Sequence, residues 1–207
     1  MKPIIYIKLR PYLKEFLMNQ EDAKGNKIYP KEPVRFAPKT RLRMMVDRMR
    51  YAKPDGVKPF VPNTRKERAE SLAIEIEVCR YVKGDENRVY LGKDAQTKIA
   101  SYIYEEMMIT AVEYIKEYFI FQQRMFPRET PSFRSAYRSF FADYGIESMD
   151  EDTLRKALER RIGSFFFQDV RKKIESKTKK SAKFGANLAN FGATAAQNAD
   201  KIVRIQE

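Results

Sequence analysis

The sequence predicts an α+β, helix-dominated fold, in which an N-terminal strand and a β-hairpin pack against a bundle of about four helices. Apolar residues with strand character occur in two short segments and recur at helical spacing in several longer ones. The chain has 207 residues, of which 43% are hydrophobic, enough to form a core. The predicted single domain covers residues 1–163. We expect residues 164–183 to form a basic amphipathic helix and residues 184–207 a flexible or conditionally ordered tail.

The first quarter of the chain alternates short elements with loops. Residues 3–9 are rich in β-branched and aromatic side chains and predict a strand, and Pro11 suits the first position of a helix over residues 12–19. Residues 21–38 contain Gly and several Pro residues and should be mostly loop. Residues 39–51 lack both and predict an amphipathic helix. Its apolar face would consist of Leu42, Met45, Val46 and Met49.

The centre of the chain predicts a β-hairpin followed by a long helix. Apolar and polar residues alternate over residues 72–82, as in a half-buried strand. Residues 83–87 have turn composition, and residues 88–91 would form the partner strand. Residues 93–123 contain neither Gly nor Pro, so they predict one helix of roughly 45 Å.

Two more helices are predicted before the C-terminal extension. They cover residues 132–144, with Gly145 as cap, and residues 150–162, followed by Gly163. The first has an aromatic stripe that we expect to pack inward. It consists of Phe133, Tyr137, Phe140 and Tyr144.

Composition excludes several classes of function. The sequence has no His and a single cysteine, Cys79, which excludes a His general base, a Cys/His zinc site and an intrachain disulfide. It also lacks a Gly-rich phosphate-binding motif. We therefore expect a non-enzymatic protein with no catalytic residues, metal or cofactor. No stretch is long and apolar enough to span a membrane, and a single thiol suits a reducing cytosol, so we expect a cytoplasmic protein.

A carboxylate metal site is the one catalytic alternative that this composition permits. Asp55, Glu75 and Glu77 loosely resemble the pattern of restriction-type nucleases. That pattern needs a basic residue two positions after the strand carboxylate, and here Glu77 and Cys79 occupy those positions. Solvent-facing carboxylates on an alternating strand explain the glutamates equally well. A second acidic group over residues 147–152 is explained by capping of a helix N-terminus.

The charge distribution points to a polyanionic partner. The chain has 41 basic and 28 acidic residues, for a net charge of +13. Residues 24–68 hold 14 basic and 4 acidic residues, and residues 171–183 hold 7 and 1. Two basic blocks therefore flank an acid-leaning centre, whereas charge that only maintained solubility would be spread more evenly.

These blocks supply the predicted nucleic-acid-binding residues. The partner is expected to be duplex DNA in preference to RNA, contacted mainly at phosphates, for which arginine is well suited. A solvated basic face is the alternative. On the polar face of the 39–51 helix the predicted residues are Arg41, Arg43, Arg48 and Arg50, and in the following loop they are Lys53, Arg65, Lys66 and Arg68, with Lys58 beside them. In the later part of the 150–162 helix they are Arg155, Lys156, Arg160 and Arg161. In the extension they are Lys172, Lys173, Lys177, Lys179, Lys180 and Lys183.

Two other interpretations remain open. The helices over 132–144 and 150–162 could form a helix-turn-helix, but the second begins with acidic residues where a recognition helix meets DNA. The chain could also be a structural or assembly protein that contacts DNA or other subunits. An apolar seam could then serve contacts between copies of the chain or with other subunits. It consists of Phe166, Val170 and Ile174.

The order of elements also resembles a known group. Residues 9–17 (LRPYLKEFL) follow the first strand, and residues 88–99 (RVYLGKDAQTKI) open the long helix; YGI at 144–146 precedes TLRK at 153–156 and a pair of arginines. In this outline, residues 1 to about 162 resemble small, basic, functionally uncharacterised proteins of phages and mobile elements of Bacteroides-type gut bacteria. The group has no assigned catalytic residues. The resemblance implies a phage or mobile-element context, in which small basic proteins serve replication, transposition, transcription control or DNA packaging. It also implies a location in the bacterial host cytoplasm or in a virion. In that context the alternative is a structural or assembly protein of a phage particle, which would contact packaged DNA or other virion subunits.

Overall fold

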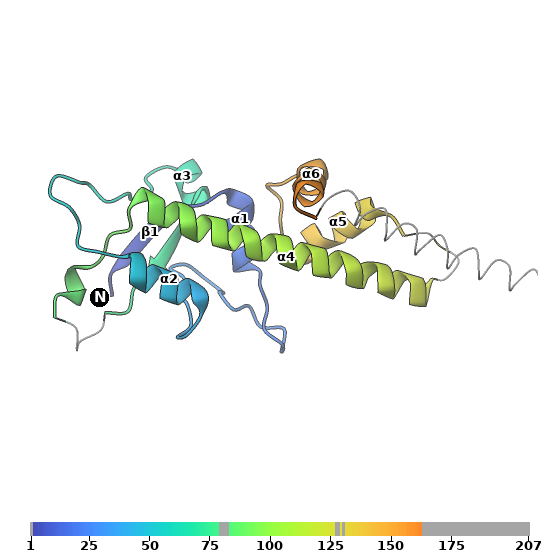
Figure 1. Ribbon diagram of the computed structural model, residues 1–207, viewed down its shortest axis with the longest axis horizontal. Helices are drawn as coiled ribbons and strands as arrows, with labels where there is room; N and C mark the ends of the chain where they lie inside the picture. The colour runs from blue at the N-terminus through green and yellow to red at the C-terminus, as the bar shows by residue number, and fades with distance from the viewer. Residues whose placement is uncertain (1, 79–82, 127–128, 130, 163–207) are drawn as a thin grey trace, which may run out of the picture.

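The computed structural model describes residues 2–78, 83–126, 129 and 131–162 (Figure 1). Within these residues it confirms the helix-dominated α+β class. The elements are β1 (Ile4–Lys8), α1 (Pro11–Met18), α2 (Arg41–Met49), α3 (Arg65–Ala69), β2 (Ser71–Glu75), the 3-10 helix η1 (Asp85–Asn87), α4 (Lys93–Met125), α5 (Phe133–Asp143) and α6 (Glu151–Ile162). Except for α3, every helix from α1 to α6 lies within two residues of a predicted one. In this part of the chain, no helix is both long and apolar enough to cross a membrane.

The sheet joins segments that are far apart in the sequence. β1 and β2 are antiparallel, with Ile4 opposite Glu75 and Lys8 opposite Ser71. On the other edge of β2, the loop residue Val34 donates its N–H to the Ala73 carbonyl at 2.8 Å. Both edges of β2 are therefore occupied.

The predicted β-hairpin between residues 72–82 and 88–91 is wrong for the described residues. β2 ends at Glu75, and Tyr90 pairs with Tyr51 instead, through N–O distances of 3.0 and 3.1 Å. Residues 71–74 are also buried on both faces rather than half-buried. The alternation correctly indicated a strand, but long-range pairing with β1 and Val34 replaced the local pairing that the turn suggested.

Helix α4 is the longest element of the described residues, and several of the other elements pack against it. It has 33 residues and so extends about 50 Å. Its first half contacts β1, α1 and α2, and α5 lies along its second half, with α6 against α5 (Figure 1). Buried residues from all these elements belong to one hydrophobic cluster. The single long helix predicted over residues 93–123 is thus confirmed, but it serves two groups of elements rather than one compact bundle.

Aromatic side chains join the two halves of the fold. Tyr137 and Phe140 of α5 are buried, as the predicted stripe requires. At the end of the stripe, the Tyr144 ring lies 5.3 Å from Phe16 of α1 and 6.4 Å from Tyr114 of α4. The α5 aromatic residues therefore form core, which is the interpretation favoured over a DNA-reading helix.

The turn between α5 and α6 is held against α1. One carboxylate oxygen of Glu15 accepts hydrogen bonds from the backbone N–H groups of Glu147 at 3.0 Å and Ser148 at 3.1 Å. Gly145 has φ +55, and a Cβ there would lie 2.6 Å from Asn19 Nδ2. The predicted glycine cap is confirmed, and a side chain at this position would disturb the contact with α1.

The two predicted loops differ in outcome. Residues 21–38 contain no helix or strand, as predicted, apart from isolated bridges. The loop after α2 instead ends in the short helix α3, which the sequence analysis did not predict. Thr64 starts it with a capping box, because its side chain accepts from the Glu67 N–H while the Glu67 carboxylate accepts from the Thr64 N–H.

Candidate nucleic-acid interface

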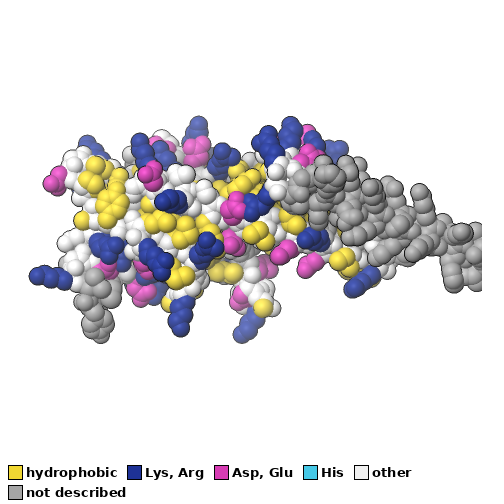
Figure 2. Space-filling view, in the orientation of Figure 1, with side chains coloured by type: hydrophobic (Ala, Val, Ile, Leu, Met, Phe, Trp, Pro, Cys, Tyr) yellow, Lys and Arg dark blue, Asp and Glu magenta, His cyan; other side chains and the backbone are white. Residues whose placement is uncertain are grey.

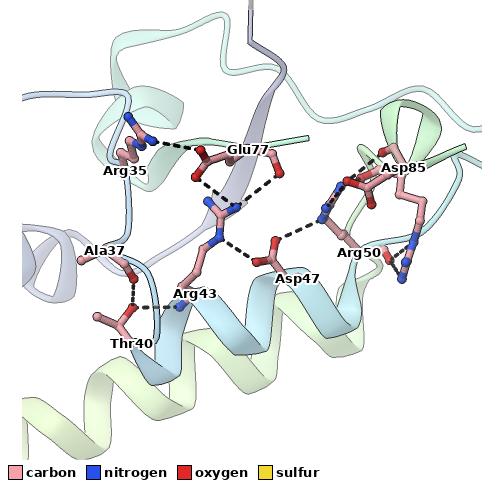
Figure 3. Close-up of polar contacts among 9 residues, drawn as sticks. Arg35, Ala37, Thr40, Arg43, Asp47, Arg50, Glu77 and Asp85 are labelled. Carbon is pink, nitrogen blue, oxygen red and sulfur yellow. Dashed lines mark hydrogen bonds and ion pairs between the residues drawn. The ribbon is translucent and has the colours of Figure 1, made fainter. Parts of the chain in front are cut away.

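The predicted apolar face of α2 is confirmed, but its polar face is not a free cationic surface. Leu42 and Val46 are buried, and Thr40 caps the helix by accepting from the Arg43 N–H at 3.2 Å. Two of its four predicted arginines take part in a network of ion pairs, which is shown in Figure 3.

Arg50 lies in the interior, with 4% of its surface exposed. Its Nη2 donates to the Asp85 carboxylate at 2.7 Å, and its Nη1 donates to the carbonyls of Asp85 at 3.3 Å and Arg88 at 3.0 Å (Figure 3). Arg88 in turn donates to the Arg50 carbonyl. The prediction that Arg50 contacts phosphates is therefore wrong, because a buried charge needs a buried partner and Asp85 provides it.

Arg43 is also occupied by acidic partners. Its Nε donates to Asp47 at 2.6 Å, and its Nη2 lies 3.7 Å from the Glu77 carboxylate. Asp47 also pairs with Arg50 at 3.2 Å, and Glu77 also pairs with Arg35 at 3.1 Å (Figure 3). Unlike Asp85, both of these carboxylates remain near solvent, so a phosphate-binding role for Arg43 stays a prediction. The network attaches α2 to the segment that follows β2.

The other two arginines of α2 are exposed. The Arg41 guanidinium lies 4.8 Å from the centre of the Tyr102 ring, an arrangement suited to a cation–π contact. Burial, and then a hydrogen bond with Glu106, raises the pKa of Tyr102 to about 12. Arg48 makes no ion pair within the described part of the chain. A phosphate-binding role for Arg41 and Arg48 stays a prediction.

The cations predicted after α2 are all on the surface. Lys53 lies in the exposed loop, whereas Arg65, Lys66 and Arg68 lie on α3. Lys66 is 3.9 Å from Glu70, a weak exposed pair. These four residues remain accessible to a partner.

The predicted cations of α6 divide into paired and unpaired residues. Arg155 is paired with Asp152 at 3.4 Å and with Glu159 at 2.9 Å. Arg161 forms an ion pair with Glu105 of α4, which lowers the pKa of that carboxyl. Among the described residues, two of the predicted α6 cations are exposed and make no ion pair. They are Lys156 and Arg160.

The C-terminal predictions lie outside the described residues. This applies to the 164–183 helix, the 184–207 tail and Gly163. It also applies to the predicted binding lysines and to the apolar seam. They are Lys172, Lys173, Lys177, Lys179, Lys180, Lys183, Phe166, Val170 and Ile174.

A large open groove of about 1150 Å³ lies beside the N-terminal half of α4. One wall is formed by the end of β1 and the start of α1, and another by the first three turns of α4. The loop over residues 57–60 and Tyr90 complete it. On the face drawn in Figure 2, apolar side chains alternate with Lys and Arg over this half of the molecule.

Four cations line the groove against one carboxylate, Glu70. The exposed residues Lys58 and Lys93 make no ion pair among the described residues. Lys8 Nζ lies 5.0 Å from the centre of the Phe60 ring. Arg10 donates to the Tyr12 hydroxyl at 3.0 Å, and this hydrogen bond raises the pKa of Arg10. Among the described residues these four cations make no ion pair, unlike the arginines of the α2 network, although backbone hydrogen bonds, and then the charge of Lys8, lower the pKa of Glu67 of α3.

Aromatic residues form much of the groove lining. Phe60, Tyr90 and Tyr104 are each partly exposed there, and Tyr12 is buried at its base. Burial raises the pKa of Tyr104, while Arg161 and Arg10 act on it in the opposite direction. Arg161 of α6, which is paired with Glu105, is therefore close enough to this part of the lining to influence Tyr104.

Most of the cations that line the groove are not among the residues predicted from the sequence. Lys8, Arg10 and Lys93 lie outside the two basic blocks. Of the four groove cations, only Lys58 was named with the predicted binding residues. The available signal was local: Lys8 and Arg10 alternate with apolar residues at the end of a strand, and Lys58 stands two residues before Phe60. Nothing in that pattern shows that the three segments meet.

Of the carboxylates considered for chemistry, the glutamates on and after β2 and the group before α6 have structural partners. Glu75 pairs with Lys2 at 2.8 Å, which lowers its pKa, and Asp55 lies in the exposed loop. Asp150 accepts from the Thr153 N–H at 2.6 Å, which confirms the capping interpretation of the 147–152 group. Glu151 adds ion pairs to two arginines of α5.

The chemistry of the interface therefore has two parts, a groove with unneutralised cations beside aromatic rings and a buried network that holds α2 in place. Within the described ranges, no group of three or more His, Cys, Asp or Glu side chains could hold a metal ion. In comparisons with protein-family models, curated proteins and solved structures, no match to the chain was found.

Proposed function

We propose that this protein binds nucleic acid, DNA in preference to RNA, mainly through phosphates and without catalysing a reaction. The observation that carries the proposal is the groove, in which Lys8, Arg10, Lys58 and Lys93 face a single carboxylate. Such cations release condensed counterions when they meet phosphates, which is the main source of sequence-independent affinity. A phage or mobile-element context, implied by the resemblance in sequence outline, belongs to the same proposal.

The surrounding surface supports this proposal. Lys53 and the cations of α3 are exposed on the segments that lead to and from the 57–60 loop, and Glu70 at the end of α3 borders the groove. Arg160 is exposed on α6, next to the Arg161 that approaches Tyr104. These residues extend the basic surface beyond the groove at both ends.

The experiment is a titration of the full chain with a labelled DNA oligonucleotide, followed by fluorescence anisotropy at several salt concentrations. Affinity should fall as salt rises. The double variant Lys58→Gln/Lys93→Gln should bind more weakly and reduce the slope of log K against log salt by about 2. The matched control Lys24→Gln/Lys31→Gln removes two exposed lysines outside the groove and should change the slope less. Absence of binding to any DNA or RNA at low salt would refute the proposal.

A second candidate function is a structural or assembly protein of a phage particle, and one observation favours it. The last turns of α4 expose a group of large apolar side chains, each at least 45% exposed: Ile120, Phe121, Met125 and Phe126. Exposed apolar groups of this kind mark contacts with other subunits. Light scattering of the full chain should then show an oligomer that Phe121→Ser/Met125→Ser converts to a monomer, and a monomeric parent protein would remove this support.

A further inference from the structure

We infer that the groove holds single-stranded DNA, with unpaired bases stacked on its aromatic rings and phosphates held by its cations. This inference rests on the proposed function and names the form of nucleic acid that the groove takes. It differs from the duplex partner expected from the charge blocks. Three observations carry it: the presence of aromatic rings beside cations, the position of charge relative to the rings, and the size and open shape. The uncharged polar side chains then decide between DNA and RNA.

The first observation is that aromatic rings and cations occur together. Phe60, Tyr90 and Tyr104 are partly exposed in the lining. Unpaired bases stack on such rings, whereas a duplex hides the faces of its bases within its own stack. A duplex would gain only from the cations, while a single strand gains from both groups.

The second observation is the position of charge relative to the rings. Lys8 Nζ lies 5.0 Å from the centre of the Phe60 ring. In a single strand each base is joined to a phosphate, so a base beside Phe60 would place its phosphate within reach of Lys8 or Lys58. The pairing of one cation with one ring matches the repeating unit of the strand.

The third observation concerns size and shape. The groove is open and has a volume of about 1150 Å³. Sites for compact drug-sized ligands are about 300–1,000 Å³ and enclose most of the ligand surface. A larger open groove with cations on several walls suits an extended polyanion that enters at one end and leaves at the other.

The choice of DNA over RNA follows from the uncharged polar groups in the lining. The Gln96 side-chain amide accepts from the Lys8 N–H at 3.1 Å and donates to the Leu91 carbonyl at 2.9 Å. The Thr97 hydroxyl donates to the Lys93 carbonyl at 3.0 Å. The 2′-hydroxyl distinguishes RNA from DNA only where a protein group contacts it. Among the non-aromatic, uncharged polar side chains of the lining, Ser101 is then the one left to contact a 2′-hydroxyl, so the groove has few groups that would favour RNA over DNA.

The test compares a labelled oligo(dT) strand, a duplex of equal length and the matching oligo(U) strand, each titrated with the full chain. Phe60→Leu keeps an apolar side chain but removes the ring, and Tyr104→Leu repeats the test on the α4 wall. The matched control is Phe141→Leu, a partly exposed aromatic residue of α5 outside the groove lining. Circular dichroism checks that each variant is folded. Because the two groove variants lie on different walls, one folded variant is enough for the test.

We expect oligo(dT) to bind more tightly than the duplex and at least as tightly as oligo(U). Phe60→Leu and Tyr104→Leu should each weaken oligo(dT) binding by roughly fivefold to a hundredfold, the effect of losing one base–aromatic stack. Duplex binding should change by less than about twofold, and Phe141→Leu should change neither.

Two results would overturn the inference, and they are distinguishable from failure of the proposed function. If a folded Phe60→Leu or Tyr104→Leu leaves oligo(dT) affinity unchanged while Lys58→Gln/Lys93→Gln weakens it, the groove binds phosphates but stacks no bases. If the duplex binds more tightly than the strand, the groove does not select unpaired DNA. In both cases nucleic-acid binding itself stands, whereas absence of all binding refutes the proposed function.

Discussion

The arginines of α2 and the cations of the groove carry the same charge, but their surroundings differ. Arg50 and Asp85 form an ion pair whose side chains are 5% and 3% exposed, and Arg43 is shared between Asp47 and Glu77. In the groove, Lys58 and Lys93 have no ion-pair partner among the described residues. Positive charge therefore stabilises the fold in one region and is available to a ligand in the other.

The difference teaches that the number of basic residues in a segment is a poor measure of its binding capacity. A buried arginine has lost its water and depends on its carboxylate partner, so it cannot be transferred to a phosphate without a large cost. An exposed lysine loses little when it meets a phosphate and gains from counterion release. Substitutions in the two regions should consequently affect different measurements.

The largest expected effect is on stability, from Arg50→Ala. The substitution removes the guanidinium that pairs with the buried Asp85 carboxylate, so the free energy of unfolding should fall by about 3–5 kcal/mol. Urea denaturation followed by circular dichroism measures this. Arg48→Ala, on the exposed side of the same helix, should cost less than about 0.5 kcal/mol. A stable Arg50→Ala protein with reduced DNA affinity would reverse the roles assigned to the two regions.

A smaller loss of stability is expected from Arg43→Gln. Arg43 is more exposed than Arg50 and its partners remain near solvent, so the loss should be about 1–3 kcal/mol. Arg43→Lys should recover only part of it, because an ammonium cannot donate to Asp47 and Glu77 in the same forked geometry. The measurement is again urea denaturation, and full recovery by lysine would show that charge alone matters here.

High pH should lower the free energy of unfolding through ionisation of Tyr102, which lies beside Arg41 of α2. Its pKa is raised from 10.0 to about 12 in the folded protein, so the unfolded chain ionises first. The stability that this tyrosine contributes is present below pH 10 and is lost as pH rises toward about 12. Unfolding free energies measured across this range should fall less steeply for Tyr102→Phe than for the parent protein. Equal slopes would mean that Tyr102 is not responsible.

The smallest effect is expected in the groove, from Glu70→Gln. Removing the single carboxylate of the lining should tighten DNA binding by roughly two- to fivefold, the size expected of one exposed charge. The gain should disappear at high salt, because exposed charges are screened. Anisotropy titrations at low and high salt measure it, and weaker binding at low salt would show that Glu70 holds the groove open rather than repelling DNA.

The sequence alone was sufficient for the local elements. The spacing of apolar residues predicted α2, α4 and α5, because each helix buries one face and that face repeats every three to four residues. Pro11, Gly145 and Asp150 marked helix ends through backbone constraints that act within a few residues. Net charge and the absence of His were also properties of composition and needed no structure.

Only the tertiary structure decided which residues meet. β2 pairs with β1 and Val34 rather than with the segment after the turn, and Arg50 meets Asp85, 35 residues away. The groove likewise assembles Lys8, Lys58 and Lys93 from three segments. Such pairings depend on burial and partner charge at long sequence separation, and these are set by how the elements pack, so no local pattern of residues encodes them.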